Sequence, residues 1–407
     1  MSAQIQTNAL PYDLARLIHS PFARLRSLLE GVDPGLPPID MSIGEPRHGV
    51  PALLAPLLAE KTADYGRYPP IHGTPELRGA ISAWIGRRYP ALDGAMDAAR
   101  HVLPLTGSRE GLFSAIFTAM ARKAGSAAHA AVLMPNPFYQ AYLAAALAGG
   151  GEPVFMAAEA ETGFFPDLDA LAPDLLSRTA AMYLASPANP QGAVASREYL
   201  RGAIQLARRH DFVLFIDECY SEIFYAEPPA GGLETAFALS GDFANVLVLN
   251  SLSKRSNVPG LRSGFIAGDA AFIADYARFR NVACPQMPLP VQHASAALWS
   301  EESHVRQSRA RYAEKIAAAD RILGRHLAGA LPAGAFFLWL KVEHLGGGEA
   351  AAKRIWKGCG VKVLPGAYLA QADAHGRNPG GPYVRIALVH DLGLATEALD
   401  RLAGLLS

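Results

Sequence analysis

Residues 245–268 read NVLVLNSLSKRSNVPGLRSGFIAG, in which two apolar runs flank a loop of small and basic residues. The first run is typical of a buried strand, and Lys254 follows its end by a few positions. A lysine at that place is either an ordinary solvated side chain or a nucleophilic amine held at the edge of a sheet. For Lys254 taken alone, a solvated side chain is the stronger interpretation. The choice between the two therefore depends on the other segments of the chain.

Apolar runs alternate with helical segments through the middle of the chain. Residues 197–210 (REYLRGAIQLARRH) have helical periodicity, and residues 106–124 (TGSREGLFSAIFTAMARKA) predict a turn that opens a helix. This alternation predicts an α/β fold with a mostly parallel sheet between layers of helices. The short apolar runs that predict its strands occupy residues 130–137, 151–157, 180–185, 212–218, 245–250 and 262–268.

The alternation of short apolar runs with helical segments ends at about residue 288. Residues 301–327 predict a long, charged, amphipathic helix, and three apolar segments after it predict strands (336–342, 361–365 and 383–389). We therefore expect a large domain at 49–288 and a smaller α+β domain at 289–407. The Pro-rich arm at 1–48 is expected to pack against the small domain, which is then built from both chain ends.

The totals exclude several classes of protein. Among 407 residues, Lys+Arg and Asp+Glu both number 37, so nothing indicates nucleic acid or a membrane surface as the main partner. The three cysteines, Cys219, Cys284 and Cys359, are too far apart for a disulfide framework or a metal pair, so we expect no metal and a reduced, cytoplasmic setting. We find neither a signal-peptide pattern nor an apolar run long enough for a membrane span.

Polar residues of different types stand at the ends of four of the apolar runs. The carboxyl ends of parallel strands meet at one edge of a sheet, so these side chains should converge there. Each has an ordinary explanation by itself, as a turn, a helix cap, a solvated lysine or a surface ion pair, but their joint occurrence favours a site. The residues are Asn189, Asp217, Tyr220, Ser251, Lys254 and Arg262.

The chemistry of this set matches one cofactor. A lysine amine forms a Schiff base with an aldehyde, and a buried aspartate keeps a pyridine nitrogen protonated so that the ring accepts electrons. Asparagine and tyrosine can donate to a phenolate oxygen, and arginine and serine can bind a phosphate. The TGSREG turn at 106–111 adds backbone N–H groups and a helix N-terminus for that phosphate. These are the needs of pyridoxal 5'-phosphate.

Residues 251–264 (SLSKRSNVPGLRSG) resemble the lysine signature of the class I/II aminotransferases, which are fold-type I pyridoxal-phosphate enzymes; Ser263 stands where a small apolar residue is more usual. The resemblance implies a mostly parallel seven-stranded sheet, small amino acid and keto acid substrates, and a homodimer with shared active sites. Seven further motifs occur in the family's order and approximate spacing: SIGEP at 42–46, RYPPIHGTPELRGAI at 67–81, TGSREGL at 106–112, PNPFYQAY at 135–142, SPANPQG at 186–192, DECYSE at 217–222 and YVRIALV at 383–389.

The resemblance also implies a role for each matching residue. Lys254 would form the Schiff base and move the proton, Asp217 would pair with the pyridine nitrogen, and Asn189 and Tyr220 would contact the ring oxygen. The phosphate would be held by Gly107, Ser108 and Arg109, largely through their backbone, and by Ser251 and Arg262. Further roles fall to Tyr139 (stacking on the ring), Arg385 (the substrate α-carboxylate), Gly44 (close backbone approach) and Tyr68 (the neighbouring subunit's cofactor phosphate).

Some alternatives stay open at this point. Tyr139 could be only a packing aromatic, with Phe138 the weaker candidate for stacking. Tyr65 and Arg67 compete with Tyr68, which is favoured by its spacing to GTPELR. Ser253 is as well explained by capping a turn.

The N-terminal segments 11–31 and 36–51 are similar to those of the N-succinyl-L,L-diaminopimelate aminotransferases of bacterial lysine and cell-wall precursor synthesis. This similarity implies ping-pong transfer of an amino group to 2-oxoglutarate. Arg47 and His48, just after Gly44, would then meet the distal succinyl carboxylate, unless both are simply solvated. The alternatives are an aspartate, alanine or aromatic aminotransferase, or a C–S lyase or cyclopropane-forming synthase with the same cofactor. A ligand sensor is disfavoured because no DNA-binding domain is evident.

Overall fold

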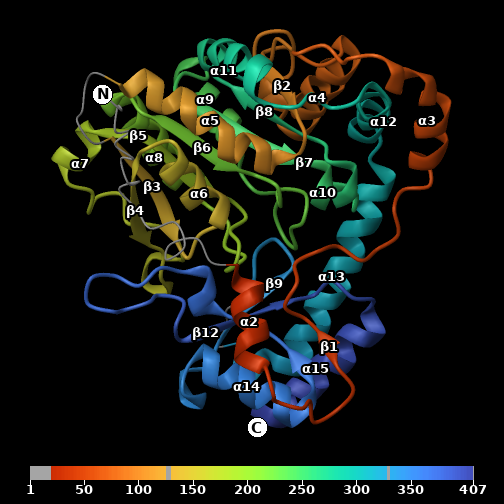
Figure 1. Ribbon diagram of the computed structural model, residues 1–407, viewed down its shortest axis with the longest axis vertical. Coiled ribbons are helices and arrows are strands. Elements are labelled where there is room, and N and C mark those ends of the chain that lie inside the picture. The colour runs from red at the N-terminus through yellow and green to blue at the C-terminus, as the bar shows by residue number, and fades with distance from the viewer. Residues whose placement is uncertain (1–19, 125–129, 328–330, 407) are drawn as a thin grey trace, which may run out of the picture.

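The computed structural model describes residues 20–124, 130–327 and 331–406 (Figure 1). Part of the N-terminal arm, residues 1–19, therefore lies outside the described residues. The large sheet of the described residues has seven strands. Only β8 runs antiparallel to its neighbours, so the expected mostly parallel sheet is confirmed. In spatial order the strands are β2 (Val102–Leu105), β8 (Gly264–Gly268), β7 (Val246–Ser251), β6 (Val213–Asp217), β5 (Thr179–Ala185), β3 (Ala131–Asn136) and β4 (Glu152–Ala157).

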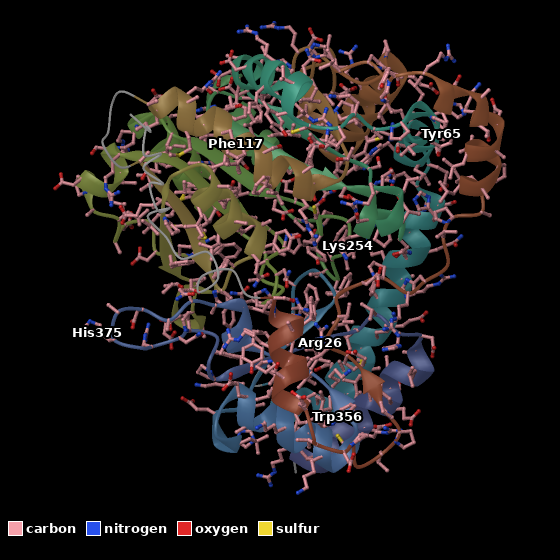
Figure 2. All side chains as sticks on the ribbon, viewed as in Figure 1. Arg26, Tyr65, Phe117, Lys254, Trp356 and His375 are labelled. Carbon is pink, nitrogen blue, oxygen red and sulfur yellow. The ribbon has the colours of Figure 1, made fainter. Side chains whose placement is uncertain are left out.

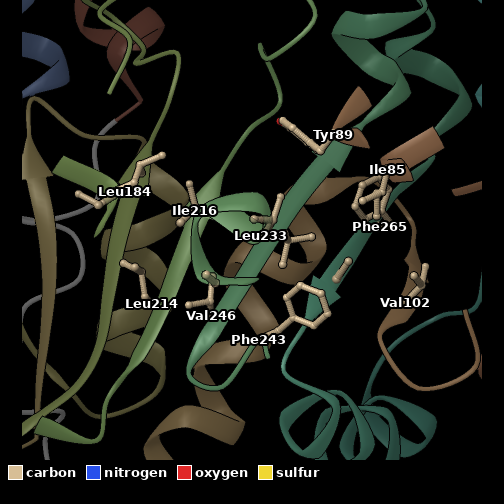
Figure 3. Close-up of a cluster of buried hydrophobic side chains, with 14 of the residues drawn as sticks. Ile85, Tyr89, Val102, Leu184, Leu214, Ile216, Leu233, Phe243, Val246 and Phe265 are labelled. Carbon is tan, nitrogen blue, oxygen red and sulfur yellow. The ribbon is translucent and has the colours of Figure 1, made fainter. Parts of the chain in front are cut away.

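Helices cover both faces of this sheet, and the strands are therefore apolar on both sides. In β6, Leu214 and Ile216 pack into one core and Val213 and Phe215 into the other, as the two-residue period of a strand requires. Figure 3 shows the first core, where side chains of several strands meet Ile85 and Leu233. That face carries α4 (Pro75–Arg88), α8 (Arg197–His210), α9 (Gly232–Ser240) and α12 (Leu289–Ser300); the other carries α5 (Ser108–Lys123), α6 (Gln140–Ala148) and α11 (Ala270–Ala283).

A second group of elements lies below the large sheet in Figure 1. Its antiparallel sheet has the order β11 (Leu364–Pro365), β12 (Tyr383–Ala387) and β9 (Phe337–Lys341). The N-terminal segment joins it, because β1 (Ile39–Asp40) pairs with β10 (Val361–Lys362) and α2 (Pro21–Leu29) packs against α14 (Gly348–Cys359). Its helices are α13 (Ser303–Leu323), α14 (Gly348–Cys359) and α15 (Leu392–Leu406).

The domain limits remain a proposal, and the packing of α12 bears on one of them. Helix α12 lies against α4 and α3 (Leu54–Glu60), and it places Leu298 and Trp299 in a core of the large sheet. We therefore propose that the large domain includes α12 and that the small domain begins with α13. In the part of the chain that the structure describes, no helix is both long enough and apolar enough to cross a membrane.

Candidate active site

The strand ends meet as the topology predicts. β5, β6 and β7 are parallel, so Asp217 at the end of β6 lies in register with Ala185 and Leu249 of its neighbours. β8 runs the opposite way, which brings Arg262, two residues before its start, to the same edge. Figure 2 shows Lys254 between the large sheet and the smaller group of elements.

A cleft of about 520 Å³ opens at this edge. Residues of the small sheet close its other side, among them Phe337 and Arg385. The expected site residues that line it are Gly44, Ser108, Arg109, Tyr139, Asn189, Asp217, Tyr220, Ser251, Lys254, Arg262 and Arg385.

Lys254 lies in the short helix α10 (Leu252–Arg255), which begins directly after β7 and is capped by Ser251. Its Nζ atom donates a hydrogen bond to the carbonyl oxygen of Gly44 at 2.7 Å. Burial lowers the pKa of the amine to about 8. A larger fraction of the amine is therefore neutral near pH 7 than for an exposed lysine, as a nucleophile or base requires.

The carboxylate of Asp217 accepts hydrogen bonds from Tyr142 and Cys219. The Tyr142 hydroxyl lies 3.1 Å from Oδ2, and the Cys219 backbone N–H lies 3.1 Å from Oδ1. Burial raises the pKa of this carboxyl above its usual value. No lysine or arginine among the described residues forms an ion pair with it, so a cationic ligand would be strongly favoured beside it. Tyr142 and Cys219 were not predicted as site residues, although both lie inside the motifs PNPFYQAY and DECYSE.

An anion cradle forms where α5 begins. Gly107 precedes the helix with a φ of 89°, and Ser108 is its first residue. A Cβ atom on Gly107 would lie 2.3 Å from Nη2 of Arg262, so the guanidinium lies directly against this turn. Arg262 also donates to the carbonyl oxygens of Pro259 (2.8 Å) and Thr106 (3.2 Å). Backbone N–H groups and a guanidinium at one helix N-terminus form a ready phosphate site.

Arg385 supplies a second cation on the opposite wall. Its side chain is buried, with Nη1 donating to Asn189 Oδ1 at 3.0 Å and Nη2 to the carbonyl oxygen of Ser42 at 2.7 Å. Its Nε is buried and has no hydrogen-bond partner among the described residues. Burial lowers the pKa of this guanidinium to about 10. A buried guanidinium with a free donor is poised for a carboxylate.

Two tyrosines complete the cleft. Tyr220 is held edge-on against Phe336 and Phe337, with ring centroids 5.4 Å and 5.6 Å away. The Tyr139 hydroxyl accepts a hydrogen bond from Nε of Arg109, whose guanidinium lies 5.6 Å from the ring centroid. Tyr139 thus joins the wall of the cleft, whereas Phe138 packs in the core behind it.

Arg47 and His48 do not lie at the cleft. Arg47 is exposed and its Nη1 lies 3.3 Å from Nδ1 of His390, away from the cleft. His48 lies with Nε2 2.8 Å from Nζ of Lys315, and burial lowers its pKa to about 4. The expectation that this pair lines the substrate site is therefore corrected: Pro46 is buried, and the chain beyond it leads toward α13. Tyr68 is fully exposed and does not line the cleft of its own chain.

The comparisons agree with this geometry. The family model for aminotransferase class I and II matches residues 37–402. The chain belongs to this family. Its members use pyridoxal phosphate, and the residues fit that group: a buried carboxylate without a cation, a lysine with a lowered pKa and an anion cradle lie around one cleft. This protein is therefore a pyridoxal-phosphate-dependent aminotransferase.

Several relatives with named activities are similar over nearly the whole chain. An LL-diaminopimelate aminotransferase from Moorella thermoacetica is 31% identical over 398 residues, covering 94% of each chain. A solved aminotransferase structure from Neisseria meningitidis is 39% identical with a TM-score of 0.90, covering 96% of this chain and 98% of that one. A probable N-succinyldiaminopimelate aminotransferase from Thermus thermophilus is 26% identical with a TM-score of 0.79, covering 95% and 100%.

Proposed function

We propose that this aminotransferase transfers the amino group of N-succinyl-L,L-diaminopimelate to 2-oxoglutarate. The observation that carries the proposal is a cation on the cleft wall that has no carboxylate partner, the guanidinium of Arg109. The similarity to a probable N-succinyldiaminopimelate aminotransferase supports it, and the similarity to LL-diaminopimelate aminotransferases supports the same carbon skeleton.

Bound pyridoxal phosphate supplies the electron sink that allows an amino acid to lose its Cα proton. We propose that Lys254 would hold the aldehyde end of the cofactor and that its amine would take up the proton removed from Cα of the substrate. Its lowered pKa suits a base that works near neutral pH. Asp217 would pair with the ring nitrogen, and Asn189 and Tyr220 would hold the ring oxygen.

The remaining expected residues would position the two anionic groups. The phosphate would be held at the start of α5 by Gly107, Ser108, Ser251 and Arg262. Arg385 binds the substrate α-carboxylate, for which its buried and unpaired Nε is the available donor. Binding at both ends fixes the Cα–H bond relative to Lys254, and such alignment lowers the barrier to proton transfer.

Arg109 is the cation that is left for the distal end of the substrate. Its backbone belongs to the phosphate turn, but its guanidinium contacts Tyr139 and forms no ion pair with any described residue. A succinyl carboxylate would give this guanidinium a bidentate partner. Free LL-diaminopimelate instead ends in an ammonium beside its carboxylate, and Arg109 repels that ammonium. This difference in charge at the distal end supports the proposal of the succinylated donor.

The test compares kcat/KM for N-succinyl-L,L-diaminopimelate, LL-diaminopimelate and alanine, each with 2-oxoglutarate. We expect the succinylated donor to be the best substrate and Arg109→Gln to reduce its kcat/KM by about 10- to 100-fold, as for a lost hydrogen bond between charged groups. Alanine should change by less than about 3-fold because it has no distal carboxylate. Arg47→Gln is the matched control and should change none of the three. Faster turnover of LL-diaminopimelate, or an equal loss on alanine, would refute the proposal.

We also propose a homodimer in which Tyr68 reaches the cofactor phosphate of the neighbouring subunit. The exposed aromatic rings of Tyr65 and Tyr68 support such a contact surface. Sedimentation of the holoenzyme as a monomer at micromolar concentration would contradict this arrangement.

A further inference from the structure

The carboxylate of Asp217 accepts a hydrogen bond from the side chain of Tyr142, for which no role was expected. The Tyr142 hydroxyl donates to Oδ2 at 3.1 Å, and Tyr142 itself is buried in the floor of the cleft. We infer that Tyr142 is a positioning residue that keeps Asp217 ionised and aimed at the ring nitrogen of the bound cofactor. The inference rests on the role proposed above for Asp217, and the experiment below separates the two.

The ring of Tyr142 is fixed by a stack of aromatic side chains behind the cleft. It lies parallel to the ring of Tyr183 with centroids 4.6 Å apart and an interplanar angle of 6°. Tyr183 stacks in turn on Phe215 at 5.2 Å, and its own hydroxyl donates to the carbonyl oxygen of Leu112 in α5. Phe215 is two residues before Asp217 on β6, so the stack and the carboxylate share one strand. The Tyr142 hydroxyl therefore has a defined direction relative to Asp217.

The charges explain why a donor is needed there. Burial raises the pKa of the Asp217 carboxyl, so without hydrogen bonds the group would tend to take up a proton. Burial also raises the pKa of Tyr142 well above its usual value, so its hydroxyl stays protonated and acts only as a donor. With the Cys219 backbone N–H on Oδ1, each carboxylate oxygen receives one hydrogen bond and keeps a lone pair for the cofactor.

The experiment measures the Kd of the cofactor-free protein for two cofactors by fluorescence titration. One is pyridoxal phosphate, and the other is its analogue with a C–H group in place of the ring nitrogen, which offers Asp217 no partner. In Tyr142→Phe, which keeps the ring and the stack, we expect binding of pyridoxal phosphate to weaken by about 10-fold or more. Binding of the analogue should change by less than about 3-fold.

Tyr183→Phe is the matched control, because it removes an equally buried hydroxyl that does not touch Asp217. It should leave the preference for pyridoxal phosphate over the analogue unchanged. In an Asp217→Asn background, Tyr142→Phe should have no further effect on this preference, since the hydroxyl acts through the carboxylate. Melting of each cofactor-free variant checks that the fold is kept.

Each other outcome is decisive. An equal loss for both cofactors in Tyr142→Phe would show that Tyr142 only packs, and no loss for either would show that its hydroxyl is irrelevant. A further loss of preference in the Asp217→Asn background would also overturn the inference. If the unmutated protein binds both cofactors equally well, the assignment of Asp217 fails instead.

Discussion

The buried ion pair between Glu110 and Arg280 gives the sharpest prediction about the phosphate turn. Glu110 lies in the first turn of α5, and its carboxylate accepts two hydrogen bonds from Arg280 of α11, at 2.5 Å and 2.9 Å. It accepts two more from the backbone N–H and hydroxyl of Thr106, at 2.8 Å and 2.9 Å. Thr106 precedes Gly107, so this carboxylate anchors the turn proposed to hold the phosphate.

We therefore expect Glu110→Gln to be strongly destabilising although it conserves shape. Four donors converge on the carboxylate, whereas an amide accepts through one oxygen and turns its own NH2 group toward donors. The Arg280 side chain is 1% exposed and cannot lose its proton, so its charge stays buried with only neutral partners. Breaking such a pair costs about 3 kcal/mol or more. The affinity for pyridoxal phosphate should fall as well, since Thr106 is released.

Urea unfolding of the cofactor-free protein at fixed concentration measures the loss of stability. The control is Arg122→Met, because Arg122 and Asp275 join the same two helices, α5 and α11, at 2.8 Å but on the surface. An exposed pair of this kind contributes about 1 kcal/mol at most. The double variant Glu110→Gln/Arg280→Met should cost clearly less than the sum of the two single variants.

Two results would contradict a stabilising ion pair between Glu110 and Arg280. A loss below about 1 kcal/mol in Glu110→Gln would mean that the pair is well solvated, contrary to its burial. An additive double variant would mean that Glu110 and Arg280 do not stabilise one another. If Glu110→Gln lowers stability but leaves the affinity for pyridoxal phosphate unchanged, the ion pair is stabilising but does not anchor the phosphate turn.

Two further predictions follow from Lys254 and Gly107. Lys254→Met should abolish turnover, yet the cofactor-free variant should be more stable than the parent by roughly 3 kcal/mol at pH 7, because a buried amine with a pKa near 8 instead of 10.5 disfavours the folded state below pH 8. The stability difference between variant and parent should shrink as the pH rises from 8 to 10.5. Thermal melting across this range measures it, and a difference that does not change with pH would contradict the lowered pKa of Lys254. Gly107→Ala should weaken binding of pyridoxal phosphate by roughly 10-fold, since φ is 89° and the new Cβ meets Arg262; unchanged affinity would contradict the proposed cradle.

The large sheet and its edge were predictable because they depend on local patterns. Each strand is a short apolar run, and parallel strands bring their carboxyl ends together whatever the loops contain. Asp217 and Lys254 follow directly from this rule, and Arg262 needs only the reversal of β8. Arg385 is different: it stands on a strand of the small sheet, and only the resemblance to the family connected it with the cleft.

The contacts that the sequence did not predict join residues far apart in the chain. Tyr142 meets Asp217 across 75 positions, and Glu110 meets Arg280 across 170. No periodicity or spacing records such pairs, because they depend on how α6 and α11 pack on the sheet. Arg47 shows the opposite error: it is three positions from Gly44, yet its side chain turns to His390. A residue that is close to a site in sequence can therefore direct its side chain away from the cleft.

Gly44 was expected for a backbone approach to the substrate, but its own packing already requires a glycine. A Cβ atom there would lie 2.7 Å from the ring of Phe337, which itself supports Arg385 at 4.5 Å. Two carbonyl oxygens of this segment also accept hydrogen bonds: that of Ser42 accepts from Arg385, and that of Gly44 accepts from Lys254. A side chain at position 44 would therefore displace the two groups that must meet the substrate, even if substrate never touched the glycine. Gly44 therefore matters for both packing and chemistry, because the segment that contains it positions the Lys254 amine and the Arg385 guanidinium.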